Sequence, residues 1–110
     1  MKKTILSSVL DTDLSFFEES GEYSLENGST ATIVMIVGDR VICANIGDSR
    51  AILSRRRKPI RLSKDHKPTS PDEKERILNA GGKVEADRVN GVLATSRSFG
   101  DFKFKVVSQS

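Results

Sequence analysis

The sequence has 110 residues, of which 36% are hydrophobic and 30% are charged, a balance typical of one small soluble domain with a modest core. Its formal net charge is +3, from 18 Lys and Arg residues against 15 Asp and Glu residues. The basic residues are spread along the chain apart from Arg55-Arg56-Arg57-Lys58, which argues against a nucleic-acid-binding module. No apolar run reaches membrane-spanning length.

The termini and the cysteine content indicate the compartment. The opening Lys2-Lys3 precedes a short apolar stretch that polar residues interrupt, so we do not predict a signal peptide. Cys43 is the only cysteine and lies in an apolar run, which excludes an intramolecular disulfide and predicts a buried structural thiol. We therefore expect a cytoplasmic or nuclear protein. The last residues, 106–110, are predicted to form an untethered end.

The first predicted element is a helix. Apolar residues recur at helical spacing over residues 5–17, which predicts an amphipathic helix within residues 1–20 that ends before Gly21 and buries one face.

An antiparallel meander is predicted over residues 28–62. Residues 30–37 are mostly β-branched and apolar, as in a strand that is covered on both sides. Strands at 41–46 and 50–54 follow, connected by turns at Gly38-Asp39-Arg40 and Gly47-Asp48-Ser49. With the helices on either side, the expected fold class is α+β.

A second helix is predicted over residues 71–80. Ser70 can cap it, Pro71 suits its first position, Glu73 completes a capping box, and Gly81-Gly82 ends it. Beyond it, residues 83–86 and 91–95 are predicted to pair as short strands around a turn that contains Asn90-Gly91.

Four motifs follow one another along the chain: Gly47-Asp48-Ser49-Arg50, Asp65-His66-Lys67-Pro68, Arg88-Val89-Asn90-Gly91 and Ser96-Arg97-Ser98-Phe99-Gly100-Asp101. Their order and spacing, with the segment 73–82 between them, resemble the middle of a PP2C-type (PPM family) metal-dependent protein serine/threonine phosphatase. The resemblance covers about residues 24–105, with Phe99 where the family usually has Leu. It implies a sandwich of two antiparallel sheets flanked by helices, and hydrolysis of phosphoserine and phosphothreonine with Mg²⁺ or Mn²⁺.

Asp48 is the candidate metal ligand. A carboxylate on a turn between two strands can be held outward, as Mg²⁺ ligands often are, although the spacing alone favours an Asp that satisfies turn amides. The resemblance favours the metal-ligand interpretation. It matches Asp48 to an Asp at the family's metal centre that is associated with a metal ion additional to the central pair.

The ligands of the family's central metal pair are expected to be missing. The upstream Asp-Gly-His-Gly-Gly motif and the downstream Asp-Gly and Asp-Asn segments have no counterpart in these 110 residues. A two-metal hydrolase needs several carboxylates, so we expect the isolated chain to be inactive.

The remaining acidic residues do not complete such a centre. Asp39, Asp65 and Asp87 are interpreted as solvated turn or loop residues. Asp101 receives the same interpretation, with the resemblance adding that it is a structural residue near the site.

His66, Arg50 and Arg97 are not assigned catalytic roles. A lone loop histidine is more often a hydrogen-bonding residue than a general acid. The family's acid histidine and phosphate-binding arginine belong to segments that are not matched. Arg50 and Arg97 are therefore predicted to form local ion pairs or to bond backbone carbonyls.

Residues 65–93 resemble the flap beside the family's active site. Its basic residues could attract an acidic or phosphorylated peptide, or could simply be the solvated face of a surface helix, which is the favoured interpretation. The tetrad at 55–58 is interpreted as a soluble hairpin turn. The basic flap residues are Lys67, Lys74, Arg76 and Lys83.

Two functions remain open. The chain is either the central part of a PP2C-like phosphatase domain or a non-catalytic interaction protein that binds itself, another phosphatase or a phosphoprotein. A partial sandwich would leave an apolar sheet face bare, so we expect a homodimer. Neither a nucleic-acid nor a membrane partner is expected.

Overall fold

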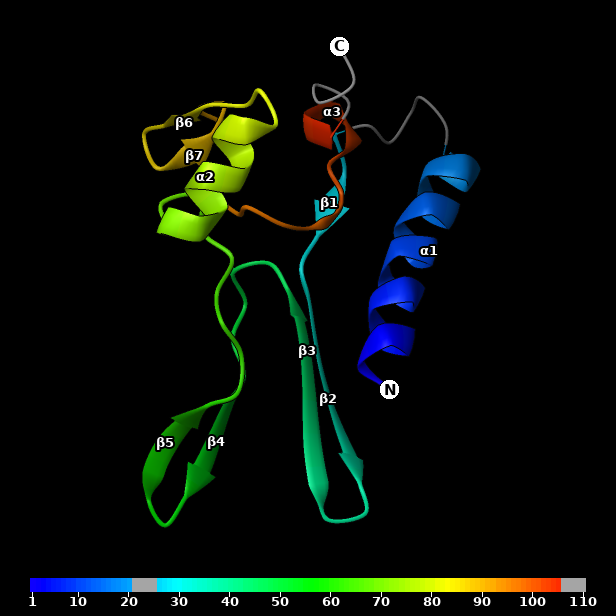
Figure 1. The fold of residues 1–110 in the computed structure, drawn as a ribbon, viewed down its shortest axis with the longest axis vertical. Helices are drawn as coiled ribbons and strands as arrows, with labels where there is room; N and C mark the ends of the chain where they lie inside the picture. Colours follow the sequence, from blue (N-terminus) through cyan, green and yellow to red (C-terminus); the bar gives the residue numbers. More distant parts are fainter. Residues whose placement is uncertain (21–25, 106–110) are drawn as a thin grey trace.

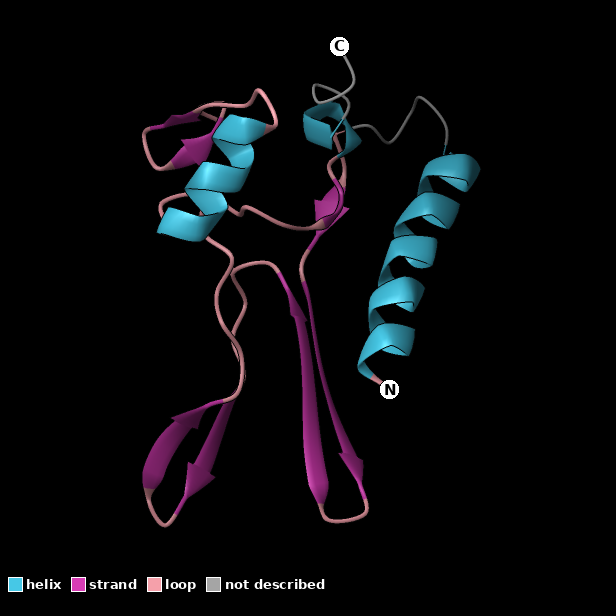
Figure 2. Ribbon diagram, viewed as in Figure 1, coloured by secondary structure: helices cyan, strands magenta, loops and turns pink. Residues whose placement is uncertain are grey.

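A computed structural model describes residues 1–20 and 26–105, and its architecture is α+β, as predicted (Figures 1 and 2). Among the described residues, the paired strands are all antiparallel, and they form four separate two-stranded sheets. The end predicted to be untethered, residues 106–110, lies outside the described residues. Within the described part of the chain, no helix combines the length and the apolar character needed to cross a membrane.

The predicted N-terminal helix is present as α1, Lys2–Ser20, but the expectation of a buried face is wrong, because none of its residues is buried. Leu10 is 70% exposed. The helix is attached mainly near its C-terminal end, where Phe16 and Phe17 pack on Phe102 with ring centroids 5.5 and 5.0 Å apart. Its N-terminal half stands beside the rest of the chain (Figure 1).

The strands β2, Ala31–Val37, and β3, Arg40–Ile46, form the longest hairpin, with Val34 opposite Cys43. Gly38 supplies the turn with a φ of +61°. The prediction that the first strand is covered on both sides is wrong, since Ile36 is 78% exposed and, within residues 1–20 and 26–105, β3 alone pairs with β2. Cys43 is correspondingly half-buried rather than buried.

The strands β4, Ile52–Arg55, and β5, Lys58–Arg61, form a second hairpin, so the predicted continuous meander is corrected. The chain leaves β3 because Ala51 bonds to residues beyond β5. Its carbonyl accepts from the Leu62 amide at 3.0 Å, and its amide donates to Ser63 Oγ at 2.9 Å. These bonds close the base of the second hairpin and direct it away from β3.

The helix α2, Pro71–Asn79, confirms the second predicted helix, with Pro71 at its start. The capping box does not form, because Ser70 makes no side-chain cap and Glu73 bonds elsewhere. The prediction for the following strands is also corrected. The strands β6, Val84–Glu85, and β7, Arg88–Val89, pair with each other, and Val89 then bridges to Leu93 across a further turn.

The first and last parts of the chain meet in a short pairing. The strand β1, Gly28–Ser29, pairs with β8, Phe99–Gly100, and α3, Phe102–Lys105, follows. The described core is small. Its buried apolar residues are Ile77 on α2, Val89 on β7, and Phe102 on α3, which packs against α1. This pairing brings residues near 28 and 100 to the end of β3, where the candidate site lies.

Candidate functional site

Asp48 lies exposed in the turn that follows β3, and the residue before it fixes the turn. Gly47 is buried with a φ of +109°, and a Cβ there would overlap the Thr30 side chain. The Gly47 amide donates to His66 Nδ1 at 3.0 Å, and its carbonyl accepts from the His66 amide at 2.9 Å. Thr30 and Ser49 share a hydroxyl hydrogen bond of 2.7 Å. The Asp48 carboxylate is thus exposed on a backbone that is held from both sides.

His66 is half-buried and acts through hydrogen bonds, which confirms its predicted role. Its carbonyl accepts from the Ser96 amide at 3.0 Å and from Thr95 Oγ1 at 3.1 Å, in addition to the two bonds with Gly47. Burial, followed by the positive charge of Arg97, lowers the pKa of His66 below its ordinary value of 6.5. A neutral imidazole whose Nδ1 accepts a bond carries its proton on Nε2. This histidine therefore joins the Asp48 turn to the segment 95–98.

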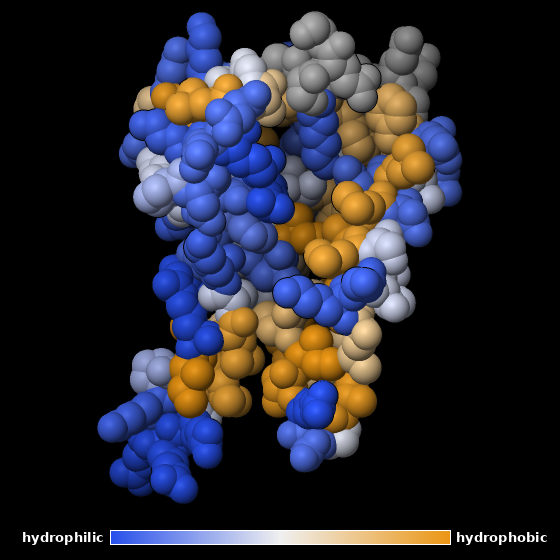
Figure 3. Space-filling view, in the orientation of Figure 1, coloured by the Kyte–Doolittle hydropathy of each residue, from blue (hydrophilic) through white to orange (hydrophobic). Residues whose placement is uncertain are grey.

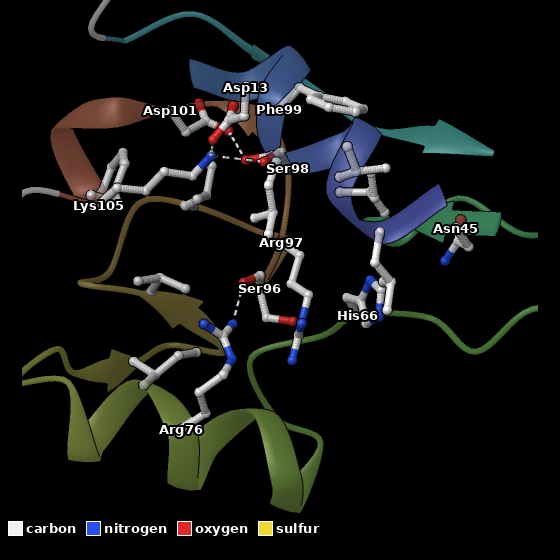
Figure 4. Close-up of a pocket in the computed structure, with 18 of the residues that line it drawn as sticks. Asp13, Asn45, His66, Arg76, Ser96, Arg97, Ser98, Phe99, Asp101 and Lys105 are labelled. Atoms are coloured by element: carbon white, nitrogen blue, oxygen red, sulfur yellow. Dashed lines mark hydrogen bonds and ion pairs between the residues drawn. The ribbon is translucent and has the colours of Figure 1, made fainter. Parts of the chain in front are cut away.

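Asp101 is 7% exposed, so its interpretation as a solvated turn residue is wrong. Ser98 Oγ donates to Asp101 Oδ2 at 2.5 Å (Figure 4), and the Asp101 amide donates to the Asn27 carbonyl at 2.8 Å. A Cβ on Gly28 would overlap the Asp101 carboxylate, so only glycine fits opposite it. Asp101 thus holds the last motif against β1.

Asp48 and Asp101, which are far apart in sequence, line one small cavity of about 260 Å³, together with Glu26, Gly28 and Ser98. The structure therefore brings the first and last motifs together. However, no group of three or more His, Cys, Asp or Glu side chains is placed to hold a metal ion within residues 1–20 and 26–105. The described residues do not fit a complete metal centre: of the three acids that line the cavity, Asp48 is exposed, Glu26 is exposed but paired with Lys103 at 2.9 Å, and Asp101 is buried.

Glu73, which was predicted to complete a capping box, is instead a buried charge. It is 4% exposed and accepts from Arg97 Nε and Nη2 at 2.8–3.1 Å and from Arg76 Nη2 at 2.9 Å. Burial alone raises the pKa of Glu73, but the arginine hydrogen bonds outweigh it and lower the pKa to about 2. Arg76 also donates to the Ser96 carbonyl at 2.7 Å. Arg97 does form an ion pair, but its partner Glu73 lies 24 residues away rather than locally, so the pair fastens α2 to the last motif.

Asp65 is the second misjudged acid, since it is 8% exposed rather than solvated. Arg50 binds it with two hydrogen bonds of 2.6 and 3.0 Å, and Arg61 lies 3.3 Å away. The Arg50 hydrogen bonds lower the pKa of Asp65 to about 2, against an opposing effect of burial. The predicted ion pair of Arg50 is confirmed. Asp39 and Asp87, in contrast, are exposed turn residues, as expected.

The basic flap residues do not converge on a pocket. Lys74 and Lys83 are exposed, which agrees with the solvated-face interpretation, whereas Arg76 is engaged by Glu73. Lys67 is exposed and its Nζ lies 4.0 Å from an Asp65 oxygen.

A larger crevice of about 920 Å³ separates α1 from β3 and α2, and it is lined mainly by apolar side chains (Figure 3). Cys43 and Ile46 contribute from β3, Ile5 and Val9 from α1, and Ile77 from α2. Such an open apolar surface is what remains when a sheet and its covering helices are only partly packed against each other.

Comparisons with known proteins place these observations in a family. The family model for Protein phosphatase 2C matches residues 1–110. The chain is 48% identical over 103 residues to Probable protein phosphatase 2C 69 from Arabidopsis thaliana, covering 91% of this chain and 29% of the relative. It is 46% identical over 99 residues to Protein phosphatase 2C homolog 3 from Schizosaccharomyces pombe, covering 90% of this chain and 24% of the relative.

The structural comparison agrees. The crystal structure of a phosphatase from Toxoplasma gondii matches with a TM-score of 0.69 and 29% sequence identity, covering 94% of this chain and 47% of that chain. The chain therefore belongs to the protein phosphatase 2C family, and its sequence corresponds to part of the PP2C-like phosphatase domain. It spans only 29% and 24% of the length of the two curated relatives just named.

Proposed function

We propose that these residues form part of a catalytic domain that hydrolyses phosphoserine and phosphothreonine in proteins with Mg²⁺ or Mn²⁺, and that Asp48 contributes one metal ligand. The observation that carries the proposal is the shared cavity of Asp48 and Asp101. Two motifs that identify the family meet there, on a backbone that Gly47, Gly28 and His66 hold in place. When bound, the metal would supply a water nucleophile near neutral pH.

We further propose that the 110-residue polypeptide alone does not turn over phosphoesters. Two-metal hydrolysis needs several carboxylates around a metal pair, and no group of three or more His, Cys, Asp or Glu side chains within residues 1–20 and 26–105 is placed to hold a metal ion. The arginines of the first and last motifs are already engaged, Arg50 with Asp65 and Arg97 with Glu73. They are therefore not free to hold a phosphoryl group.

The second candidate is a non-catalytic interaction protein that pairs with a second copy of itself. The accessible surface is 8162 Å². A compact monomer of 12.1 kDa exposes only about 6,000 Å². The excess of about 2,000 Å² per chain exceeds what a stable dimer of standard size needs to bury. The apolar side chains of β2 and α1 account for much of the exposed hydrophobic surface, which makes them the proposed contact between copies.

A hydrolysis assay tests the catalytic proposal. The purified chain is incubated with p-nitrophenyl phosphate, and separately with a phosphothreonine peptide, at neutral pH with added Mn²⁺. We expect no turnover above background. Enzyme-like turnover that Asp48→Asn abolishes would overturn the inactivity of the isolated chain, with Asp39→Asn as the matched control in another exposed turn.

Metal binding is tested separately from hydrolysis. Paramagnetic broadening of amide signals by Mn²⁺ should centre on Asp48 and disappear in Asp48→Asn, while Asp39→Asn should keep it. Broadening that Asp48→Asn leaves unchanged would remove Asp48 from the proposed metal site.

A further inference from the structure

The hairpin of β4 and β5 and the residues beside it form the most basic segment of the chain. Residues 50–67 contain eight of the 18 Lys and Arg residues but only one of the 15 acidic residues, Asp65, so their net charge is +7. Because the whole chain has a net charge of +3, the other 92 residues carry −4. The hairpin projects from the rest of the molecule and ends in a hydrophilic lobe (Figures 1 and 3).

The four basic residues at the hairpin tip have no counter-charge within the described structure. Arg55, Arg56, Arg57 and Lys58 are all exposed, and none of them makes an ion pair or side-chain hydrogen bond with any residue of 1–20 or 26–105. The acid at the hairpin base, Asp65, is already occupied by other cations. Neighbouring like charges repel each other, so the tip attracts an anion from outside.

The turn at the tip has a backbone that its residues disfavour. Arg56 and Arg57 have φ values of 53° and 63°, in the left-handed region. In a two-residue hairpin connection this conformation favours Asn-Gly, and two long side chains there lower stability. Strained residues persist where their side chains serve a function, and here both side chains carry an exposed guanidinium.

We propose that this tip binds an acidic segment of a protein partner, rich in Glu, Asp or phosphoserine, and that the partner is the phosphoprotein substrate. A planar guanidinium matches carboxylate and phosphate oxygens in pairs. Beside the tip, Leu53 and Ile60 lie opposite each other and are 38% and 39% exposed, which suits the apolar residues of a peptide.

A peptide fits these features better than a nucleic acid does. Residues 50–67 contain no Phe, Tyr or Trp on which a base could stack. The net negative charge of the other 92 residues opposes a long polyanion such as duplex DNA, which would extend beyond the hairpin. A short acidic segment needs to contact only the tip.

The identity of the partner as the substrate rests on the proposed function, and it sets a spacing. Arg56 follows Asp48 by eight residues, so their Cα atoms are at most about 28 Å apart. An extended peptide covers that distance in about eight residues. The acidic segment therefore lies within about eight residues of a phosphorylated residue that reaches Asp48.

Fluorescence anisotropy of the 110-residue chain tests the binding. The probe is a labelled dodecapeptide with six consecutive Glu residues, and its control has six Gln residues. In Arg56→Asn/Arg57→Gly, we expect the dissociation constant for the Glu probe to rise about tenfold while Tm rises by about 5 °C, because the turn is relieved. Arg56→Lys/Arg57→Lys should retain most of the affinity, and Lys74→Gln/Lys83→Gln should change it less than twofold.

Equal affinities of the original chain and Arg56→Asn/Arg57→Gly for the Glu probe would overturn the proposal. A second result would also overturn it. If the chain bound a 20-base-pair DNA duplex more tightly than the Glu probe at the same ionic strength, and Arg56→Asn/Arg57→Gly lost that binding, the tip would be assigned to nucleic acid. An inactive phosphatase leaves both results unaffected, because hydrolysis is not measured.

A second probe tests the substrate assignment in a chain whose Asp48 amide signal Mn²⁺ has been shown to broaden, so that failure of the metal site is recognised separately. It carries phosphothreonine eight residues from the Glu run and should bind more tightly than the Glu run in Mn²⁺, with Asp48→Asn removing the gain. The absence of any gain would refute the substrate assignment and leave tip binding standing.

Discussion

The buried carboxylate of Glu73 offers the sharpest test of how the candidate site is held together, through the substitution Glu73→Gln. Gln keeps the shape of the side chain but removes the charge that Arg97 and Arg76 share. Both arginine side chains are 46% exposed, so water can solvate them partly once the partner is neutral. The loss should therefore be smaller than that of a fully buried ion pair.

The magnitude follows from the pKa of Glu73. Hydrogen bonds from the arginines, set against burial that acts to raise it, lower this pKa from 4.5 to about 2. Such a shift corresponds to roughly 3 kcal/mol of stability at neutral pH. Because the pKa is lower in the folded chain, the contribution is complete above about pH 4.5 and is lost as the pH falls towards 2. Since Gln retains an acceptor oxygen, we expect Glu73→Gln to cost about 2 kcal/mol at pH 7.

Urea unfolding followed by circular dichroism measures this loss at several pH values. The stability difference between the original chain and Glu73→Gln should be constant near neutral pH and should vanish between about pH 4.5 and 2. Taking the difference removes the parallel contribution of Asp65, whose pKa is also about 2. Glu75→Gln is the matched control, because Glu75 is exposed on the same helix, and it should change stability by less than about 0.5 kcal/mol.

A loss below about 0.5 kcal/mol for Glu73→Gln, or a loss that does not depend on pH, would refute this reasoning. It would mean that the hydrogen-bond geometry rather than the charge fastens α2 to the last motif. A double-mutant cycle with Arg97→Gln separates the pair from its surroundings and should return a coupling of about 1–2 kcal/mol.

Three further predictions concern other parts of the structure. An NMR titration of the His66 ring should give a pKa below 6.5, since burial disfavours its charged form; a value of 6.5 or above would contradict its placement. Gly28→Ala should lower Tm far more than Ser29→Ala, because its Cβ would overlap the Asp101 carboxylate; equal Tm values for the two variants would contradict the close packing. Sedimentation equilibrium at micromolar concentration should show a homodimer that Val34→Lys disrupts or precipitates, and a well-folded monomer before substitution would refute self-association.

The elements that the sequence predicts correctly depend on neighbours along the chain. The hairpin of β2 and β3 follows from β-branched residues on either side of Gly38-Asp39, and α2 begins at Pro71 as its sequence indicates. The pairing of β4 with β5 instead of β3 was missed, because it depends on bonds from Ala51 to residues beyond the hairpin. The pattern of neighbouring residues along the chain contains no information about hydrogen-bond partners that are distant in sequence.

The same limit applies to the candidate site. Asp48 could be predicted as the candidate metal ligand because it lies in a recognisable motif. The hydrogen-bonding role of His66 could be predicted because it is a lone histidine in a loop. The buried states of Asp65 and Asp101 could not be predicted, because an acid in a loop is usually solvated. Glu73 matched a capping box, yet Arg97, 24 residues away, attracts it more strongly than the helix end does. Only the folded arrangement reveals such pairs.

The pairing of β1 with β8 has a consequence for the order in which the chain folds. Gly28 lies opposite Gly100, so this contact closes a loop of 72 residues, whereas the hairpins close loops of a few residues. Loop closure over that length costs about 2–3 kcal/mol more than a tight turn, and it follows the microsecond formation of the hairpins. The cavity shared by Asp48 and Asp101 is therefore assembled last and opens first on heating. Hydrogen exchange should report this as faster exchange at the Asp101 amide than in β2 and β3.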